Sequence, residues 1–445
     1  MASPPTGMHP NANNVVGGDA NHGYDNMNFE NTLSFARQLD KKDPLKSYRS
    51  LFHIPKKNGK EFIYLCGNSL GLQPKAVEKQ LQIELTDWKN LGVEGHVHGK
   101  RPWLYYHHFF SKSIAKLVGA SQQEVVVMNQ LTVNLNLMLI SFYRPSGKRN
   151  KILIQANEFP SDYYAFEQQI KLHGLNPADC IIEVMPRPGD VTLRTEDIIA
   201  KIEQHKDELA LVMFSAVNYY TGQFFECAEI GKACNKHSIN YGLDLAHAIG
   251  NVELKLHEWG VDFATWCSYK YLNSGPGGVS GVFVNSKHAN SFDLPRLAGW
   301  WGNDEKTRFE MRKHFVPQPG AAGWQISNAP VLSMAAHKAS LEIFDKAGIK
   351  ALRKKSELLT GYLEFLLRQK TEAGGVGFNV ITPTNKKHRG CQLSIQTQAN
   401  GKKLFEKITK AGVIADWREP DVIRVAPVPL YNKFEEVFRF VELLR

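Results

Sequence analysis

The sequence predicts an α/β protein: a mainly parallel sheet with flanking helices, followed by a smaller C-terminal α+β domain. Between residues 125 and 284, short apolar runs alternate with amphipathic stretches, a spacing typical of βαβ units. From about residue 330 the pattern changes to two long helical runs, three strand-like pieces and a closing helix. In such sheets ligands bind outside the carboxyl ends of the strands, so we expect the chemistry there.

Hydrophobic periodicity gives the expected elements. The strands expected in the sheet are "KILIQA" (151–156), "CIIEVMP" (180–186), "LALVMFS" (209–215), "INYGLDLAHA" (239–248), "FATWCSYK" (263–270) and "GVSGVFV" (278–284). Helices are expected over 32–52, 161–174, 194–208, 333–348, 349–370 and 433–445, and C-terminal strands over 378–383, 391–396 and 422–428.

Composition divides the chain into four parts. Residues 1–28 are rich in Asn, Gly and Pro and lack periodic apolar positions, which predicts a disordered tail. We expect 29–75 to be an N-terminal segment that joins the small domain, 76–330 to be the large α/β domain and 331–445 to be the small domain. The boundaries follow the change of pattern near residue 330.

Several classes of protein are not favoured by the composition. No apolar run approaches the length of a membrane span, and the N-terminus has no apolar signal-peptide core. Six cysteines without a CxxC pair predict reduced thiols and a cytoplasmic location. The net charge of +10 is dispersed over the chain, so neither a nucleic-acid partner nor a membrane partner is predicted.

A lysine stands where a solvated residue is not expected. Lys270 lies in "WCSYKYLNSGPGG" (266–278), between an apolar run and a glycine-rich turn. Its ammonium group could simply reach water over a buried stem. Alternatively, burial disfavours the charged form of a lysine and leaves a nucleophilic amine. Asp244 ends an earlier apolar run and His247 follows it; in isolation these two indicate a helix cap and a buried histidine.

Taken together, Asp244 and Lys270 predict a pyridoxal phosphate site. The lysine forms a Schiff base with this cofactor, and the carboxylate keeps the ring nitrogen protonated so that the ring accepts electrons. The phosphate needs donors such as those at a helix N-terminus. "VVVMNQLTVNLNLMLISF" (125–142) predicts a strand, a turn and a helix that opens near Thr132. "NEFPSDYYAF" (157–166) predicts another strand-to-helix turn, with Phe159 able to stack on a ring and Asp162 beside it.

Longer motifs carry a resemblance from about residue 30 to the end of the chain. They are "HGKRPW" (98–103), "LTVNLNLML" (131–139), "FPSD" (159–162), "YTGQ" (220–223), "DLAHAIGNVEL" (244–254), "WGVDFATWCSYKYLN" (259–273), "RLAGWWG" (296–302), "ISNAP" (326–330) and "IRVAPVPLYN" (423–432). With these motifs the chain resembles the kynureninase family of class V, fold-type I (aspartate aminotransferase-like) pyridoxal phosphate enzymes.

The resemblance implies an activity and partners. The implied reaction is hydrolytic Cβ–Cγ cleavage of L-kynurenine or 3-hydroxy-L-kynurenine to anthranilate or 3-hydroxyanthranilate and L-alanine, in tryptophan catabolism and NAD biosynthesis. The implied cofactor is pyridoxal 5'-phosphate, the implied ligand is a small molecule, and the implied assembly is a homodimer.

The resemblance also implies roles for individual residues. Lys270 carries the cofactor, Tyr269 is the acid–base partner near the substrate carbonyl, and Asp244 pairs with the pyridine nitrogen. The residues implied to contact the cofactor are Leu131, Thr132, Phe159, Pro160, Ser161, Asp162, Ser215, Asp244, His247, Tyr269, Lys270, Trp300 and Asn328. Those implied to bind the substrate are His96, Ser327 and Asn328 at its aromatic end and Arg424 at its α-carboxylate. In a dimer, Trp300 and Asn328 would come from the neighbouring subunit.

Other interpretations stay open. The same cofactor serves class V aminotransferases and cysteine desulfurases, but a desulfurase needs a reactive thiol on a mobile loop, and Cys391 stands beside a predicted strand. An inactive binding protein is disfavoured by the intact Asp244, Lys270 and Arg424. No metal site is predicted, because "HVH" (96–98) lacks a third ligand at a suitable spacing. Trp301 beside Trp300 leaves the tryptophan assignment ambiguous by one residue.

Overall fold

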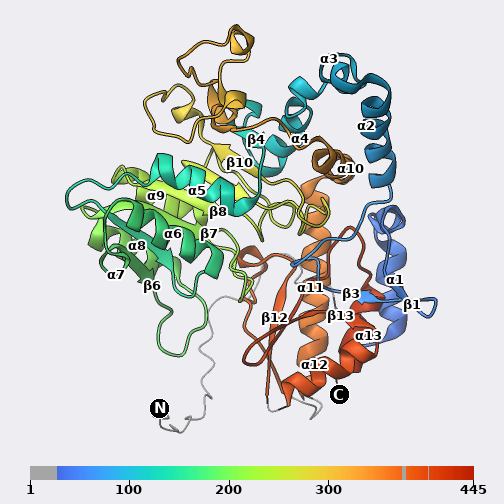
Figure 1. The fold of residues 1–445 in the computed structure, drawn as a ribbon. Helices are drawn as coiled ribbons and strands as arrows, with labels where there is room; N and C mark the ends of the chain where they lie inside the picture. The colour runs from blue at the N-terminus through green and yellow to red at the C-terminus, as the bar shows by residue number, and fades with distance from the viewer. Residues whose placement is uncertain (1–27, 373–376, 399, 445) are drawn as a thin grey trace, which may run out of the picture.

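The computed structural model describes residues 28–372, 377–398 and 400–444, so all but the last residue of the predicted tail lies outside the described residues. Its centre is a seven-stranded sheet in the order β4-β10-β9-β8-β7-β5-β6 (Figure 1). These strands are β4 (Val125–Val127), β5 (Lys151–Gln155), β6 (Ile181–Val184), β7 (Leu209–Ser215), β8 (Asn240–Asp244), β9 (Phe263–Trp266) and β10 (Gly281–Val284). The predicted mainly parallel sheet is confirmed, with β10 antiparallel to both its neighbours.

The strands are almost continuously apolar because both faces of the sheet are covered. Successive side chains of a strand point to opposite faces. Accordingly, Ile152 and Ile154 of β5 join one core cluster, and Leu153 between them joins the other. The first cluster includes side chains of α5 (Leu131–Phe142) and α6 (Pro160–Leu172). The second includes side chains of α4 (His108–Val118), α8 (Thr195–His205) and α9 (Cys227–Lys236).

The remaining helices lie around this layered core. They are α2 (Val77–Leu91), α3 (Gly95–His98), α7 (Pro177–Cys180) and α10 (Val331–Ala347). Helix α10 packs on α2 and α4. No helix among the described residues combines the length and the apolar character needed to cross a bilayer.

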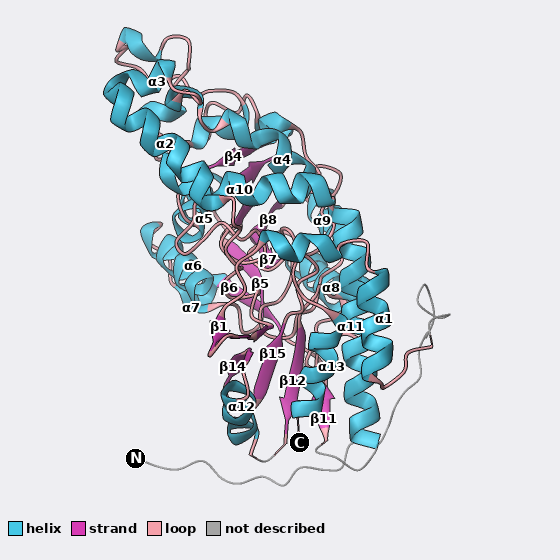
Figure 2. Ribbon diagram, turned by 90° about the vertical axis from the view of Figure 1, so that its right-hand side faces the viewer, coloured by secondary structure: helices cyan, strands magenta, loops and turns pink. Residues whose placement is uncertain are grey.

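A second, antiparallel sheet follows in the C-terminal part, in the order β11-β12-β15-β14. Its strands are β11 (Phe378–Val380), β12 (Leu393–Thr397), β14 (Asp416–Arg418) and β15 (Val422–Val425), and the helices of this part are α11 (Ile349–Glu372), α12 (Gly401–Lys410) and α13 (Phe434–Leu443). Figure 2 shows α11 and α13 alongside this sheet, with α1 (Leu33–Lys42) next to them.

The N-terminal segment is tied to the C-terminal part. Helix α1 packs on α13, and β3 (Ile63–Tyr64) pairs in parallel with β13 (Val413–Ile414); β1 (Lys56–Lys57) and β2 (Lys60–Glu61) form a separate hairpin. The predicted helix over 32–52 was wrong in its length. Helix α1 ends at Lys42 and a 3₁₀ turn covers Lys46–Leu51, because Pro44 restricts the preceding residue and has no N–H to continue the helix. The domain boundaries at 28, 75 and 330 stay predictions.

Removing Asp43 should destabilise the protein strongly. The Lys355 amine lies 2.8 Å from the Asp43 carboxylate, both side chains are buried, and the amine also donates to the Pro429 carbonyl at 2.7 Å. Burial lowers the pKa of Lys355, and Asp43 opposes that shift. Asp43→Ala should therefore lower the free energy of unfolding by about 3 kcal/mol or more, because a buried cation loses its partner.

The measurement is urea unfolding at pH 7, with Asp197→Ala as the control. Asp197 pairs with Arg187 at 2.6 Å on the surface, where an ion pair contributes little. Equal effects of the two substitutions would contradict the prediction.

Candidate active site

A cavity of about 120 Å³ lies at the carboxyl ends of the parallel strands. Its lining residues are Leu131, Thr132, Phe159, Ser161, Asp162, Ser215, Tyr219, Asp244, Ala246, His247, Cys267, Tyr269 and Lys270. Every residue predicted to contact the cofactor is therefore in this cavity, except Pro160, Trp300 and Asn328. The roles of the individual residues stay predictions.

Two polar side chains of the cavity stand on the last residues of strands. Ser215 is the last residue of β7 and Asp244 the last of β8. The predicted strand over 239–248 was too long: an Asp244 carboxylate oxygen accepts the Ala246 N–H at 2.7 Å, which turns the chain. The predicted strand over 263–270 also ends early, at Trp266, and Lys270 follows in the loop.

The N-termini of two helices also line the cavity. Helix α5 begins at Leu131 and α6 begins at Pro160, where proline fits because the first helical N–H has no partner within the helix. The hydroxyls of Thr132 and Ser161 lie 2.8 Å apart and join the two helix starts. Free N–H groups and the helix dipoles favour an anion at this point.

The amine of Lys270 is held by an imidazole. Lys270 Nζ lies 2.9 Å from His247 Nε2 and 6.0 Å from the centre of the Phe159 ring. Burial, with a smaller effect from Lys270, holds the pKa of His247 well below its usual value, which favours a neutral imidazole. Its other nitrogen, Nδ1, is buried and has no hydrogen-bond partner.

Three buried carboxyls share this cavity region with one amine. Burial raises the pKa of Asp244, and Lys270 and the Ala246 N–H oppose that shift. Burial also raises the pKa of Asp162 well above its usual value, and the charge of Asp244 raises it further. Both carboxyl oxygens of Asp162 lack a hydrogen-bond partner of ordinary geometry. Burial therefore disfavours the charged form of both carboxyls, and only at Asp244 do an amine and a backbone N–H oppose it together.

The third carboxyl, Glu158, was missed by the sequence reasoning. One of its oxygens accepts from the Phe159 N–H at 2.8 Å, and from the Gln155 amide and the Ser215 hydroxyl at 2.9 Å each. Burial, with Asp244 adding to it, raises the pKa of Glu158 to about 7. Its position directly before "FPSD", at a strand-to-helix turn, was a usable signal. Tyr219 and Cys267 were also missed, although Tyr219 directly precedes "YTGQ" and Cys267 lies within "WGVDFATWCSYKYLN".

Arg424 approaches the cavity from the C-terminal sheet. This buried side chain on β15 forms an ion pair with Asp416 of β14 and donates to the Tyr219 carbonyl. Its guanidinium carbon lies 6.0 Å from the centre of the Tyr219 ring, which lines the cavity. The Nε of Arg424 is buried and has no hydrogen-bond partner, whereas both terminal nitrogens are bonded.

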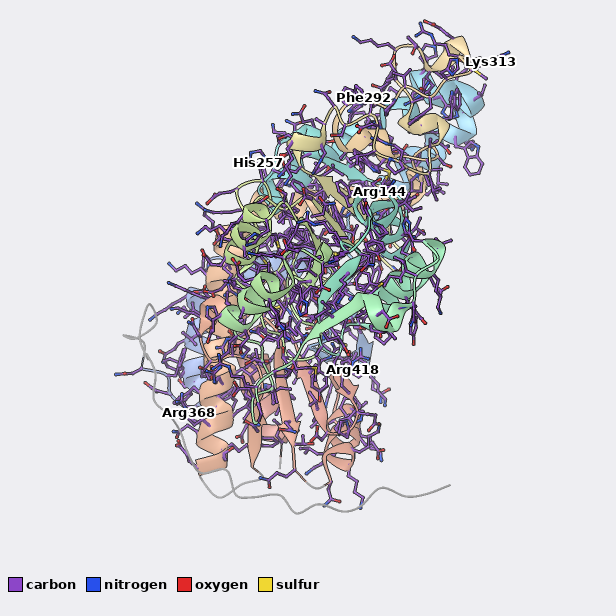
Figure 3. All side chains as sticks on the ribbon, turned by 90° about the vertical axis from the view of Figure 1, so that its left-hand side faces the viewer. Arg144, His257, Phe292, Lys313, Arg368 and Arg418 are labelled. Atoms are coloured by element: carbon purple, nitrogen blue, oxygen red, sulfur yellow. The ribbon has the colours of Figure 1, made fainter. Side chains whose placement is uncertain are left out.

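The other predicted substrate residues line a separate cleft of about 720 Å³. Its lining residues are Val93, Glu94, His96, Val97, Leu104, Trp300, Trp301, Phe309, Ile326, Ser327 and Asn328, and none of them lines the Lys270 cavity. Trp300 is 47% exposed and Trp301 4% exposed, so Trp300 is the ring open to a ligand. Lys313 follows the cleft residues Trp300, Trp301 and Phe309 in the chain. Figure 3 shows it at the opposite end of the molecule from Arg368 of the C-terminal part.

The residues of the first cavity fit pyridoxal phosphate. They offer an amine, a buried carboxylate, an anion site at two helix starts, and buried polar atoms of Asp162 and His247 without partners. Fold and site together define a pyridoxal phosphate-dependent enzyme of fold type I.

The sequence comparisons name the family. The model of the kynureninase C-terminal domain matches residues 352–444. A kynureninase of Myxococcus xanthus is 53% identical over 418 residues, which cover 94% of this chain and 97% of the relative. A kynureninase of Nematostella vectensis is 48% identical and covers 92% of each chain. The chain belongs to the kynureninase family, as the motifs implied.

Solved structures confirm the fold class. The cystine C–S lyase C-DES, in a variant with glycine covalently linked to its pyridoxal phosphate, has a TM-score of 0.72 at 14% identity and covers 86% of this chain and 96% of its own. A cysteine desulfurase of Escherichia coli has a TM-score of 0.71 at 16% identity and covers 90% and 97%. Cys391, the thiol considered for desulfurase chemistry, is buried, and burial raises its pKa to about 12.

Glu158→Gln should change how stability depends on pH. An acid whose pKa is higher in the folded than in the unfolded protein binds more protons when folded, so stability falls as pH rises from the unfolded value of about 4.5 through about 7. In the cofactor-free protein, Glu158→Gln should therefore be more favourable at pH 8.5 than at pH 5.5.

Urea unfolding at the two pH values measures this difference. Glu183→Gln, at an exposed position of β6, is the matched control. The prediction fails if the two substitutions have the same pH dependence.

Proposed function

We propose that this chain hydrolyses the Cβ–Cγ bond of L-kynurenine and 3-hydroxy-L-kynurenine, giving anthranilate or 3-hydroxyanthranilate and L-alanine. The pair of Lys270 and the buried Asp244 in one cavity carries the proposal, in a chain that is about half identical to kynureninases over most of its length. The setting we propose is tryptophan catabolism and NAD biosynthesis in the cytoplasm.

Different residues of the cavity would bind different parts of the cofactor. Lys270 Nζ would hold it covalently, Asp244 would pair with its ring nitrogen, and Phe159 would stack on the ring. The starts of α5 and α6, with Thr132 and Ser215, would hold the phosphate. When bound, pyridoxal phosphate supplies an electron sink for negative charge that develops on the substrate carbons.

Side chains of the protein would transfer the protons and orient the substrate. Lys270 Nζ would take the α-proton of the substrate, and His247, 2.9 Å away, would orient this amine. Burial raises the pKa of Tyr269 above its usual value, so its hydroxyl stays protonated at neutral pH and can donate to the carbonyl oxygen that becomes negative as water adds. The free edge of Arg424 binds the α-carboxylate, a bidentate task suited to a guanidinium.

Product analysis with Lys270→Ala tests the reaction. Purified wild-type protein loaded with pyridoxal phosphate should release equal amounts of L-alanine and an anthranilate from either substrate. Lys270→Ala should abolish turnover and leave no cofactor that borohydride can fix to the chain, because no other amine lines the cavity among the described residues. Release of an amino-transfer product, or cofactor fixed on another lysine, would contradict the proposal.

We further propose a homodimer in which each active site is built from two chains. The Lys270 cavity and the His96–Trp300–Asn328 cleft share no residue within one chain. Large apolar side chains are exposed around the cleft, among them Val93, Val97, Phe309 and Met311. Apolar groups gathered in this way are typical of a surface that another chain covers.

Coexpression of two inactive variants tests the shared site. Lys270→Ala removes the amine, and His96→Trp with Asn328→Trp fills the cleft. Half of randomly assembled dimers are mixed, and each mixed dimer has one intact site of two, so activity should recover to about a quarter of wild type. Sites built within one chain would give no recovery.

Substrate preference should depend on His96 and Asn328. A 3-hydroxyl group adds a donor and an acceptor to the substrate ring, and the His96 Nδ1 in the cleft is buried without a partner. A polar site of this kind loses binding when the matching group is absent. We therefore expect 3-hydroxykynurenine to be the better substrate, and His96→Trp with Asn328→Thr to lower kcat/KM at least about tenfold more for it than for kynurenine. Equal losses on both substrates would contradict this assignment.

A further inference from the structure

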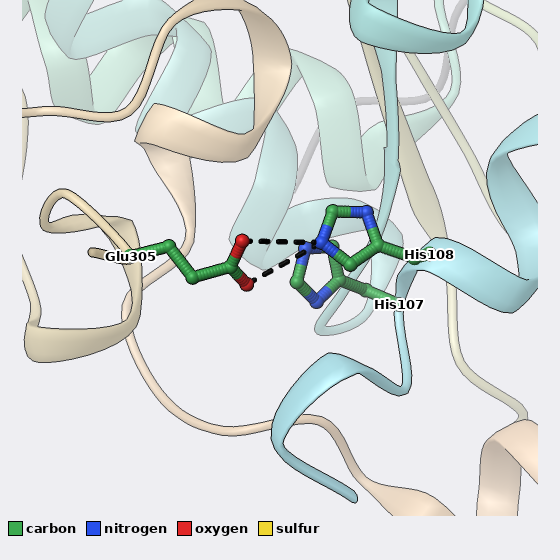
Figure 4. Close-up of side chains that lie close together, drawn as sticks. All are labelled: His107, His108 and Glu305. Carbon is green, nitrogen blue, oxygen red and sulfur yellow. Dashed lines mark hydrogen bonds and ion pairs between the residues drawn. The ribbon is translucent and has the colours of Figure 1, made fainter. Parts of the chain in front are cut away.

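A group of metal-ligating side chains lies outside both cavities. His107 directly precedes α4, His108 is its first residue, and Glu305 follows the 3₁₀ turn Trp300–Gly302. One ligand atom from each side chain lies within 4.8 Å of the other two (Figure 4). Within the parts of the chain that the structure describes, this is the one set of three such side chains that converges.

His107 is the unusual member of the group. Its side chain is 3% exposed, and neither ring nitrogen has a hydrogen-bond partner, although buried polar groups are nearly always paired. Since no donor or acceptor occupies either nitrogen, the ring can offer a nitrogen lone pair to a ligand.

The geometry suits a small divalent cation. His108 Nε2 lies 3.3 and 3.4 Å from the two carboxylate oxygens of Glu305. Two ligands of a tetrahedral zinc ion, each about 2.0–2.1 Å from the metal, lie roughly 3.3 Å apart. His108 is exposed and Glu305 only partly buried, so small side-chain rotations can bring both to the fixed His107.

We propose that His107, His108 and Glu305 bind one divalent transition-metal ion, with Zn²⁺ the best match and a fourth position open to water. Two imidazoles and one carboxylate form a borderline donor set that suits Zn²⁺ better than Ca²⁺ or Mg²⁺. The sequence did not indicate this site, because Glu305 is 197 residues from His108.

Neighbouring charges set the strength of binding. The Arg308 guanidinium is buried close by, donates to the Trp301 carbonyl at 2.7 Å and lies 4.5 Å from the centre of the Trp301 ring. Its positive charge opposes a cation, and the carboxylate of Glu305 offsets it. Glu305 is thus required both to coordinate the ion and to offset the positive charge of Arg308.

The ion would connect two separate segments. Trp300 donates its indole N–H to the Arg308 carbonyl at 3.1 Å, so the segment between Trp300 and Arg308 contains Glu305 and closes on itself. A metal bond from Glu305 to the start of α4 would fix this segment against the helix, and Zn²⁺ should raise the melting temperature.

Metal binding to the purified, cofactor-loaded protein tests the proposal. After treatment with a chelating resin, the protein is dialysed against Zn²⁺, and bound metal is counted per chain; Co²⁺ is used in parallel for its visible absorbance. We expect one tight equivalent. The variants His108→Asn and Glu305→Gln change partly exposed side chains and should fold. Loss of even an outer-sphere partner weakens metal binding about 10- to 100-fold, so each variant should weaken it about 100-fold or more.

His98→Asn is the matched control. His98 is an exposed histidine that faces only Glu94, at 3.6 Å, so this variant should bind Zn²⁺ and gain thermal stability as wild type does. The proposal is overturned if wild type binds no equivalent, or if His108→Asn and Glu305→Gln bind and respond to Zn²⁺ as well as His98→Asn does.

Discussion

The buried charge of Asp244 is the constraint on which the site depends. A carboxylate in this environment is costly unless cations or N–H groups face it. Lys270 and the Ala246 N–H meet that need. The Ala246 N–H comes from the turn after Asp244, and Lys270 comes from the loop after β9, which lies parallel to β8 so that their carboxyl ends share one edge. The neighbouring carboxyls cannot all be charged as well. Burial and the charge of Asp244 raise the pKa of both Asp162 and Glu158.

The fold and the Lys270 cavity could be predicted from the sequence because strand ends are visible in it. Continuous apolar runs mark strands covered on both faces. Ser215 and Asp244 are the last residues of two such strands, and Lys270 lies in the loop after a third. The antiparallel direction of β10 could not be predicted, because a strand buried on both faces lacks the alternation of apolar and polar residues that is typical of antiparallel strands.

Contacts between distant segments account for what the sequence did not indicate. For Glu158 the sequence offered only its position before "FPSD"; its contact with the hydroxyl of Ser215, 57 residues away in the chain, was not visible. The assembly of His96, Trp300 and Asn328 in one cleft was implied only by family resemblance, since no periodic pattern links residues so far apart. His107, His108 and Glu305 were missed for the same reason. Contacts between residues so far apart depend on the tertiary packing of the chain, and no pattern in a single sequence indicates them.

The orientation of Arg424 illustrates how the C-terminal sheet serves the cavity. An arginine side chain loses much rotational freedom when it is fixed, and an unfixed one must lose it on binding substrate. Here β14 and β15 place Asp416 opposite Arg424 in register, and the Tyr219 carbonyl holds a second nitrogen. The guanidinium is therefore already fixed, with its Nε edge unpaired. Both partners bind the terminal nitrogens, so the Nε–H is the guanidinium donor that is left for a carboxylate.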